Sequence, residues 1–471
     1  MPARSTELPP PNTVRRVLLV LLAVVMVAAA GVTAVLVVNS GEEPFASQTG
    51  PALPDPVLPD LTTPDPVLAD DAGDEPLPDP TILASLLSPT IDDPRLGGRL
   101  LARVVDVAGG EILFDSASDV PGTPASNAKL LTAFAVLTSL EPGDRLMTRV
   151  VAGSTPGEIV LVGRGDPTLS RTAPSLTYPE APTVADLAAQ VLSSAVGVPI
   201  TSIVVDGSLY SGPSVSPLWK TGDAPSTYAA PITAVMVDGG RVDPASRSRS
   251  ATPDLDAGVA LAAAIGLPDL PVSSGTAAPG SAVLAEVGSA PLSRLVETML
   301  ALSDNVLAES LARQVALSRG QPADFTGSAA AVTDAVAAAG LDTSGLEIVD
   351  GSGLSAQNAV PARLFTDVLR AVAAEDGDPA LVAISSGLPV AGYDGTLFER
   401  YEGGLAVGAG SVRAKTGTLN GVNTLAGYVV TAEGRVLAFA LIADQLPAGP
   451  LIGGEPVLDD IAGILASCGC R

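Results

Sequence analysis

The chain of 471 residues contains no histidine, only two cysteines and only 3% aromatic residues. Without histidine, a Ser-His-Asp or Cys-His catalytic apparatus is excluded. Zinc binding is disfavoured, because only two cysteines remain among the preferred ligands. Those two, Cys468 and Cys470, lie at the extreme C-terminus and cannot staple a fold of this size. Any hydrolytic chemistry therefore needs another base, and we expect no metal or organic cofactor.

Positive charge is also scarce. The chain has 25 Lys+Arg against 51 Asp+Glu, a net charge of −26. Nucleic acid is a disfavoured partner, because phosphate binding requires a basic face. Only three of the basic residues are lysines, namely Lys129, Lys220 and Lys415. Lysine can lose its proton when desolvated and arginine effectively cannot, so these three are the first candidates for a chemical role.

Apolar residues make up 47% of the chain, enough for a sizeable core of mostly Ala, Val and Leu. Residues 17–38 form an apolar or small run without charge, and as a helix it would span about 33 Å. Basic residues precede this run and acidic residues follow it, which predicts a cytoplasmic tail over 1–16 and the main body outside. The competing interpretation is a signal peptide cleaved near residues 28–30. We favour an uncleaved, single-pass membrane anchor, because the apolar run continues past that point.

The rest of the chain divides into regions that differ in composition and in predicted secondary structure. Residues 39–80 are rich in Pro, Asp, Ser and Thr, which predicts a disordered linker. Residues 81–141 and 287–471 hold strand candidates near both ends and helix candidates between them. This order predicts an α+β fold, an antiparallel sheet sandwiched by helices. Residues 142–286 mix short strands, Pro/Gly loops and helices, and are predicted to be an inserted mixed α/β region.

The expected elements are as follows. The predicted strands are 103–107, 111–114, 411–416, 423–431 and 435–443. The predicted helices are 126–140, 183–196, 291–302, 306–317 and 456–466.

Ser126 and Lys129 form the chain's one Ser-x-x-Lys pattern. At the start of a helix, positions i and i+3 share a face, so the hydroxyl and the amine can touch. A lysine kept neutral by burial and by a second cation could remove the serine proton. A helix N-terminus would further disfavour the ammonium and favour a developing oxyanion. Taken alone, the pattern favours the simpler interpretation of a capping serine and a solvated lysine.

A second pattern, Ser303-Asp304-Asn305, falls between two predicted helices. Its serine could relay a proton and its asparagine could hold a substrate amide. The alternative is that Ser303 or Asp304 simply caps the following helix.

A third pattern, Lys415-Thr416-Gly417-Thr418, lies on a predicted strand. A lysine, two hydroxyls and a strand edge suit a terminal carboxylate and a peptide bound as an added strand. Gly417 would let the substrate approach the backbone. A similar triplet beginning at Lys220 lies in a Pro-rich stretch before Ser303, and we interpret it as a chance match.

The three patterns in this order are typical of penicillin-binding proteins and class A β-lactamases. The chain from 81 to 471 resembles the D-alanyl-D-alanine carboxypeptidase/endopeptidase family of low-molecular-mass class C penicillin-binding proteins. Further segments similar to that family are 161–169, 228–232, 350–355 and 392–397. The resemblance implies the penicillin-binding, transpeptidase-like serine acyltransferase fold.

The resemblance also implies roles for the catalytic residues. Ser126 would be the acylated nucleophile and Lys129 its base. Ser303 would pass the proton to the leaving D-alanine, and Asn305 would orient the acyl chain. The implied substrates are peptidoglycan stem peptides ending in D-Ala-D-Ala, with β-lactams as covalent inhibitors.

The resemblance assigns the third pattern to substrate binding. Lys415, Thr416 and Thr418 would bind the terminal carboxylate, with Gly417 between them. Backbone N–H groups of Ser126 and Thr418 would form the oxyanion hole, and Lys415 would help to keep the neighbouring lysine neutral.

Two other functions remain open at this point. A serine β-lactamase of class A needs a Glu-x-x-x-Asn loop, and none occurs between Lys129 and Ser303. An inactive, wall-binding scaffold would not need an intact set of motif residues. One departure from the family is the interval from Ser126 to Ser303, which is shorter than two full inserted domains would require, so we expect one insert to be reduced or missing.

Overall fold

The computed structural model describes residues 75–195, 197–374, 377–401, 407–450 and 452–470. The predicted tail 1–16, the apolar segment 17–38 and most of the linker 39–80 lie outside these residues. Within the described part of the chain, no helix combines the length and the apolar character needed to cross a bilayer.

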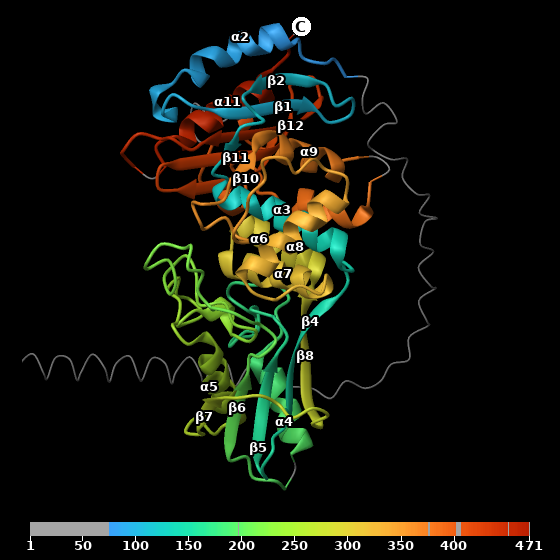
Figure 1. Ribbon diagram of the computed structural model, residues 1–471, viewed down its shortest axis with the longest axis vertical. Helices are drawn as coiled ribbons and strands as arrows, with labels where there is room; N and C mark the ends of the chain where they lie inside the picture. Colours follow the sequence, from blue (N-terminus) through green and yellow to red (C-terminus); the bar gives the residue numbers. More distant parts are fainter. Residues whose placement is uncertain (1–74, 196, 375–376, 402–406, 451, 471) are drawn as a thin grey trace, which may run out of the picture. The chain divides into compact units, whose positions relative to one another are not determined.

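A five-stranded antiparallel sheet organises the domain that carries the three motifs (Figure 1). Its strands are β1 (Leu101–Asp106), β2 (Ile112–Ser116), β10 (Val412–Leu419), β11 (Val422–Val430) and β12 (Val436–Ala443). Their order is β10-β11-β12-β1-β2, so the first strand of the domain pairs with the last and β10 forms an edge. The predicted antiparallel sheet is confirmed.

Helices cover both faces of this sheet. On one face pack α2 (Pro80–Ile91) and α11 (Glu455–Ser467). The opposite face and the layer beyond it hold α3 (Ala128–Ser139), α6 (Leu292–Leu302), α7 (Asn305–Ser318), α8 (Phe325–Ala338), α9 (Ala362–Val372) and α10 (Val382–Gly387). Because both faces are covered, nearly every residue of β11 and β12 is buried, and β12 is an almost continuous apolar run. A two-stranded pair, β3 (Pro121–Gly122) with β9 (Val360–Pro361), lies outside the main sheet.

A second five-stranded sheet forms the inserted region. Its order is β7-β6-β5-β4-β8, where β5, β6 and β7 are parallel and β4 is antiparallel to both of its neighbours. The strands are β4 (Arg145–Ala152), β5 (Glu158–Gly163), β6 (Ser202–Asp206), β7 (Val272–Ser274) and β8 (Val283–Pro291). Helices α4 (Val184–Ser194) and α5 (Pro253–Ile265) pack on it around a separate apolar core. The predicted boundary at residues 286 and 287 falls inside β8, which continues directly into α6.

Residues 207–252 of the inserted region are irregular. Over this stretch, all of which is described, the regular structure is one 3₁₀ turn at Asp238–Gly240. The stretch is nevertheless anchored: Trp219 and Met236 join a small core with Phe325 of α8. The rings of Trp219 and Phe325 meet edge to face with their centroids 5.1 Å apart. This packing brings a loop of the insert against the motif-bearing domain.

Candidate active site

The three sequence motifs converge on one cleft with a volume of about 740 Å³. Its lining includes Ser126 from the start of α3, Ser303 and Asn305 from the α6–α7 junction, and Thr416 and Thr418 from the edge strand β10. Residues far apart in the sequence therefore face the same volume.

Ser126 lies in a 3₁₀ turn (Ala125–Asn127) that leads directly into α3. The Lys129 amine, Nζ, donates a hydrogen bond to Ser126 Oγ at 2.9 Å, and the lysine side chain is completely buried. Neither a capping serine nor a solvated lysine describes this pair. The hydroxyl and the amine touch, as the i, i+3 spacing predicts.

Lys129 Nζ makes two further contacts, to Asn305 Oδ1 and to the carbonyl oxygen of Ser352, both at 2.7 Å. These two oxygens can only accept, whereas the hydroxyl of Ser126 can also donate. The three contacts match the three N–H groups of an ammonium. Once the amine loses a proton, its two N–H groups remain for the two acceptors and its lone pair faces the Ser126 hydroxyl. The same contacts are therefore satisfied by an uncharged lysine, whose lone pair is then directed at Ser126.

Burial lowers the pKa of Lys129 to about 8. The carboxylates of Asp350, Asp304 and Glu309 act in the opposite direction, so desolvation outweighs them. A pKa near 8 leaves a useful fraction of the amine neutral close to physiological pH, which is the condition for general-base chemistry.

Lys415 lies beneath the cleft and does not line it. Its amine is buried and donates to the backbone oxygen of Thr416 at 2.8 Å. Burial, followed by the charge of Lys129, holds the pKa of Lys415 well below its usual value. Because side chains alternate along a strand, Thr416 and Thr418 face the cleft while Lys415 and Gly417 face inward. Burial, more than a second cation, therefore lowers the pKa of Lys129.

Gly417 was expected to leave room for the substrate, but in the structure it leaves room for neighbouring residues of the protein itself. A Cβ at this position would lie 2.1 Å from Thr424 Oγ1 and 2.9 Å from the backbone oxygen of Pro124. The space is filled by the turn that precedes Ser126, with no room left for a substrate. Gly417 thus lets strand β10 approach the turn that leads to Ser126 closely.

The α6–α7 junction places the second motif. Ser303 ends α6 in the left-handed conformation, with φ of 54°. Asp304 Oδ1 accepts the N–H groups of Val306 and Leu307, so Asp304 does cap α7, as the alternative expected. The same geometry turns Ser303 and Asn305 into the cleft. Asn305 Nδ2 donates to the backbone oxygen of Tyr228 at 3.2 Å, which fixes the amide orientation.

The two threonines of β10 are held by groups at the rim. The hydroxyls of Thr416 and Thr396 lie 2.8 Å apart, and Thr418 Oγ1 donates to Glu455 Oε1 at 2.7 Å. Arg400 also lines this end of the cleft and pairs with Asp459. The rim offers two oriented hydroxyls and a guanidinium where an anionic group could sit.

Asp350, which holds the turn that contacts Lys129, was not identified from the sequence. Asp350, buried, accepts the N–H of Gly353 and of Ser355, and also Trp219 Nε1–H at 2.8 Å. This closes the turn that presents the Ser352 carbonyl to the lysine. The similarity of segment 350–355 to the family was the signal that could have identified it.

Lys220 also lines the cleft, although the sequence indicated only a chance match. It reaches there from the irregular loop of the insert and not from a strand. It does not reproduce the geometry of the third motif.

Comparisons with known proteins agree with this geometry. The model of the D-Ala-D-Ala carboxypeptidase 3 (S13) family matches residues 83–256 and 243–452. Carboxypeptidase DacB of Mycolicibacterium smegmatis is 40% identical over 93% of this chain and 94% of its own length. A carboxypeptidase of Mycobacterium tuberculosis is 42% identical over 80% of this chain and 82% of its own.

Among solved structures, penicillin-binding protein 4 of Haemophilus influenzae superposes with a TM-score of 0.66 at 22% identity. The match covers 81% of this chain and 98% of that one, and it shows a shared fold. The family expected from the motifs is confirmed: this chain belongs to the D-Ala-D-Ala carboxypeptidase 3 (S13) family.

Proposed function

We propose that this protein is a serine-type D-Ala-D-Ala carboxypeptidase that works through an acyl-enzyme on Ser126. The observation that carries the proposal is the contact set of Lys129, whose amine meets the Ser126 hydroxyl and two oxygens that can only accept. Membership of the S13 family and the names of the two mycobacterial relatives support it.

In the acylation step, the Ser126 hydroxyl gives its proton to Lys129 as Oγ bonds to the carbonyl carbon of the penultimate D-alanine. Backbone N–H groups of Ser126 and Thr418 stabilise the oxyanion. Ser303, which lines the same cleft, passes the proton to the departing amine as the peptide bond breaks. Water then attacks the ester and Lys129 accepts the water's proton, which frees the shortened peptide and restores Ser126.

Substrate recognition uses the edge of the sheet. The stem peptide lies along β10 as an added strand. Thr416 and Thr418 donate to its terminal carboxylate. Asn305 orients the acyl chain. The strand edge also accommodates a cross-linked peptide, and hence endopeptidase cleavage.

The same cleft accepts β-lactams, whose ring carbonyl and carboxylate take the places of the peptide's own. Fast release of the drug would need a second base for the water. The Glu-x-x-x-Asn loop of class A β-lactamases is missing between Lys129 and Ser303. We therefore expect a long-lived penicilloyl enzyme.

For localisation, residues 17–38 would anchor a single-pass cell-membrane protein, with 39–80 as a spacer that holds the enzyme near the wall. Mass spectrometry of the mature N-terminus separates this from secretion. An intact N-terminus supports the anchor, and a new terminus near Gly31 contradicts it.

The function is tested by labelling with a fluorescent penicillin, followed by intact-mass analysis and an assay of D-alanine release. A lasting adduct on Ser126 together with D-alanine release is the expected result. Rapid turnover of the drug would indicate a β-lactamase, and the lack of any adduct an inactive scaffold.

A further inference from the structure

The Asp304 carboxylate joins the catalytic motif to the inserted region. Its Oδ1 caps α7, whereas its Oδ2 accepts hydrogen bonds from Tyr178 Oη at 2.9 Å and from Arg249 Nη2 at 3.0 Å. Arg241 Nη2 lies 3.8 Å from the same oxygen. Asp304, Tyr178 and Arg249 are all buried. A carboxylate flanked by Ser303 and Asn305 is therefore held by three side chains of the insert.

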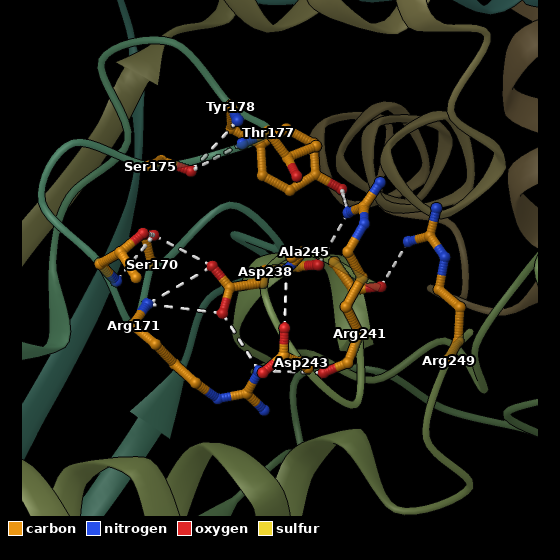
Figure 2. A network of polar contacts seen from close by, with 12 residues as sticks. Ser170, Arg171, Ser175, Thr177, Tyr178, Asp238, Arg241, Asp243, Ala245 and Arg249 are labelled. Carbon is orange, nitrogen blue, oxygen red and sulfur yellow. Dashed lines mark hydrogen bonds and ion pairs between the residues drawn. The ribbon is translucent and has the colours of Figure 1, made fainter. Parts of the chain in front are cut away.

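These three side chains are themselves fixed (Figure 2). Arg241 Nη1 donates to Tyr178 Oη at 3.2 Å, and its guanidinium lies 5.5 Å from the centre of the tyrosine ring. Arg249 donates to the backbone oxygen of Gly239. A Cβ on Gly239 would lie 2.1 Å from Tyr178 Oη, so only glycine admits this packing. The left-handed φ of +65° at Gly239 also suits glycine.

We propose that Tyr178, Arg241 and Arg249 of the inserted region are positioning residues for the reaction at Ser126: they hold Asp304, and with it Ser303 and Asn305, in place against Lys129. The inference rests on the proposed function and adds a role for the insert. Only one residue separates the Asp304 contacts from the base. Asn305 follows Asp304 directly, and Asn305 Oδ1 lies 2.7 Å from the Lys129 amine.

The two arginines also neutralise a charge that acts on the base. Asp304 raises the pKa of Lys129, as do Asp350 and Glu309, whereas Lys415 is the cation that faces it. Arg249 and Arg241 counteract the burial of Asp304 and hold the pKa of that carboxyl well below its usual value. If Arg249 were neutral, the charge of Asp304 would act more fully on Lys129, and the lysine pKa would rise.

The test measures the rate of Ser126 acylation by a fluorescent penicillin between pH 6 and pH 10, on the full chain. Arg249→Gln should lower the rate at pH 7 by about 10-fold to 100-fold, through lost positioning. It should also move the acid limb of the profile upward by about half a pH unit to one pH unit. Arg249→Lys keeps the charge but loses the planar guanidinium. Its acid limb should stay at the wild-type pH, and its acylation rate should lie between those of the wild type and Arg249→Gln.

Arg171→Gln is the matched control. Arg171 pairs at 3.1 Å with Asp238, another buried carboxylate of the same network, and does not contact Asp304. Arg171→Gln should lower the melting temperature without shifting the acid limb of the pH profile. The double variant Arg249→Gln/Asp304→Asn, which removes both charges, should return the limb towards the wild-type position.

The proposal is overturned if Arg249→Gln and Arg171→Gln slow acylation equally and neither moves the limb. If Arg249→Gln does not fold, Tyr178→Phe removes one hydroxyl from Asp304, and it should slow acylation about 3-fold to 10-fold, by more than Arg171→Gln does at a comparable loss of thermal stability. A Tyr178→Phe enzyme with the wild-type rate would equally refute the proposal. Failure of the proposed function shows separately, as the lack of a Ser126 adduct in the wild-type protein.

Discussion

The two sides of the cleft are built in different ways. On the side of the antiparallel sheet, the groups assigned to the proposed reaction come from short motifs at the ends of regular elements, such as Ser126 before α3 and Thr418 on β10. On the inserted side, Tyr178, Arg241 and Arg249 come from irregular segments and contact no reacting group directly. The motif residues can therefore be recognised from their spacing in the sequence. The residues that hold them in place are brought together only by tertiary packing.

The largest expected effect is at the base. Lys129→Arg should reduce acylation and D-alanine release by at least about 1,000-fold, because a guanidinium cannot accept the Ser126 proton. Lys129→Met, similar in size and uncharged, should do the same. Intact-mass analysis after penicillin labelling measures the loss, and circular dichroism checks the fold.

Lys220→Arg is the control for this change, since Lys220 lines the same cleft from the inserted side. It should keep nearly full activity. Full activity of Lys129→Arg would contradict the assigned base.

The next effect tests a contact between the two sides. Trp219→Phe keeps an aromatic ring against Phe325 but removes the indole N–H from Asp350. One buried acceptor then loses a donor, so the free energy of unfolding should fall by about 1–3 kcal/mol. Urea denaturation measures it. An unchanged unfolding midpoint would show that the insert does not support the turn that holds Lys129.

A smaller effect is expected at the rim. Thr418→Val removes a hydroxyl with little change in shape, and should raise KM for a D-Ala-D-Ala peptide by about 10-fold. Thr418→Ser, which keeps the hydroxyl, is the control. The penalty should disappear for a peptide with a C-terminal amide; the same penalty on both peptides would mean that Thr418 does not bind the carboxylate.

The smallest effect belongs to the far part of the insert. Arg149 and Glu286 form a partly exposed ion pair between β4 and β8. Arg149→Gln should change the free energy of unfolding by only about 0–0.5 kcal/mol and leave the kinetics unaltered. A large loss of activity here would extend the catalytic role of the insert well beyond the Asp304 contacts.

Much of the catalytic domain could be predicted from the sequence. Strands β11 and β12 are rich in Val, Leu and Ala and carry no charged residue, and the Glu433-Gly434 turn separates them. Helix α9 is missing from the predicted elements. Its apolar residues Leu364, Phe365 and Val368 recur at helical spacing, so the sequence does carry a signal for it. Residues 207–252 carry no periodic pattern, because their conformation is set by Trp219 and Met236 packing against another domain.

The site shows the same division. The contact of Ser126 with Lys129 follows from i, i+3 spacing. The inward orientation of Lys415 and the contact of Gly417 with Thr424 depend on strand register and on a turn about 290 positions away in sequence, at Pro124. No local pattern encodes such distances, so the reasons assigned to these two residues needed the structure.

The central claim is that an uncharged Lys129 removes the proton of Ser126. Its most direct test is the pH dependence of wild-type acylation by a β-lactam. Burial lowers the lysine pKa to about 8, and the neutral form is the reactive one, so the rate should be constant above that pH. Below it the rate should fall about 10-fold per pH unit. A rate that stays flat from pH 9 down to pH 6 would contradict the account.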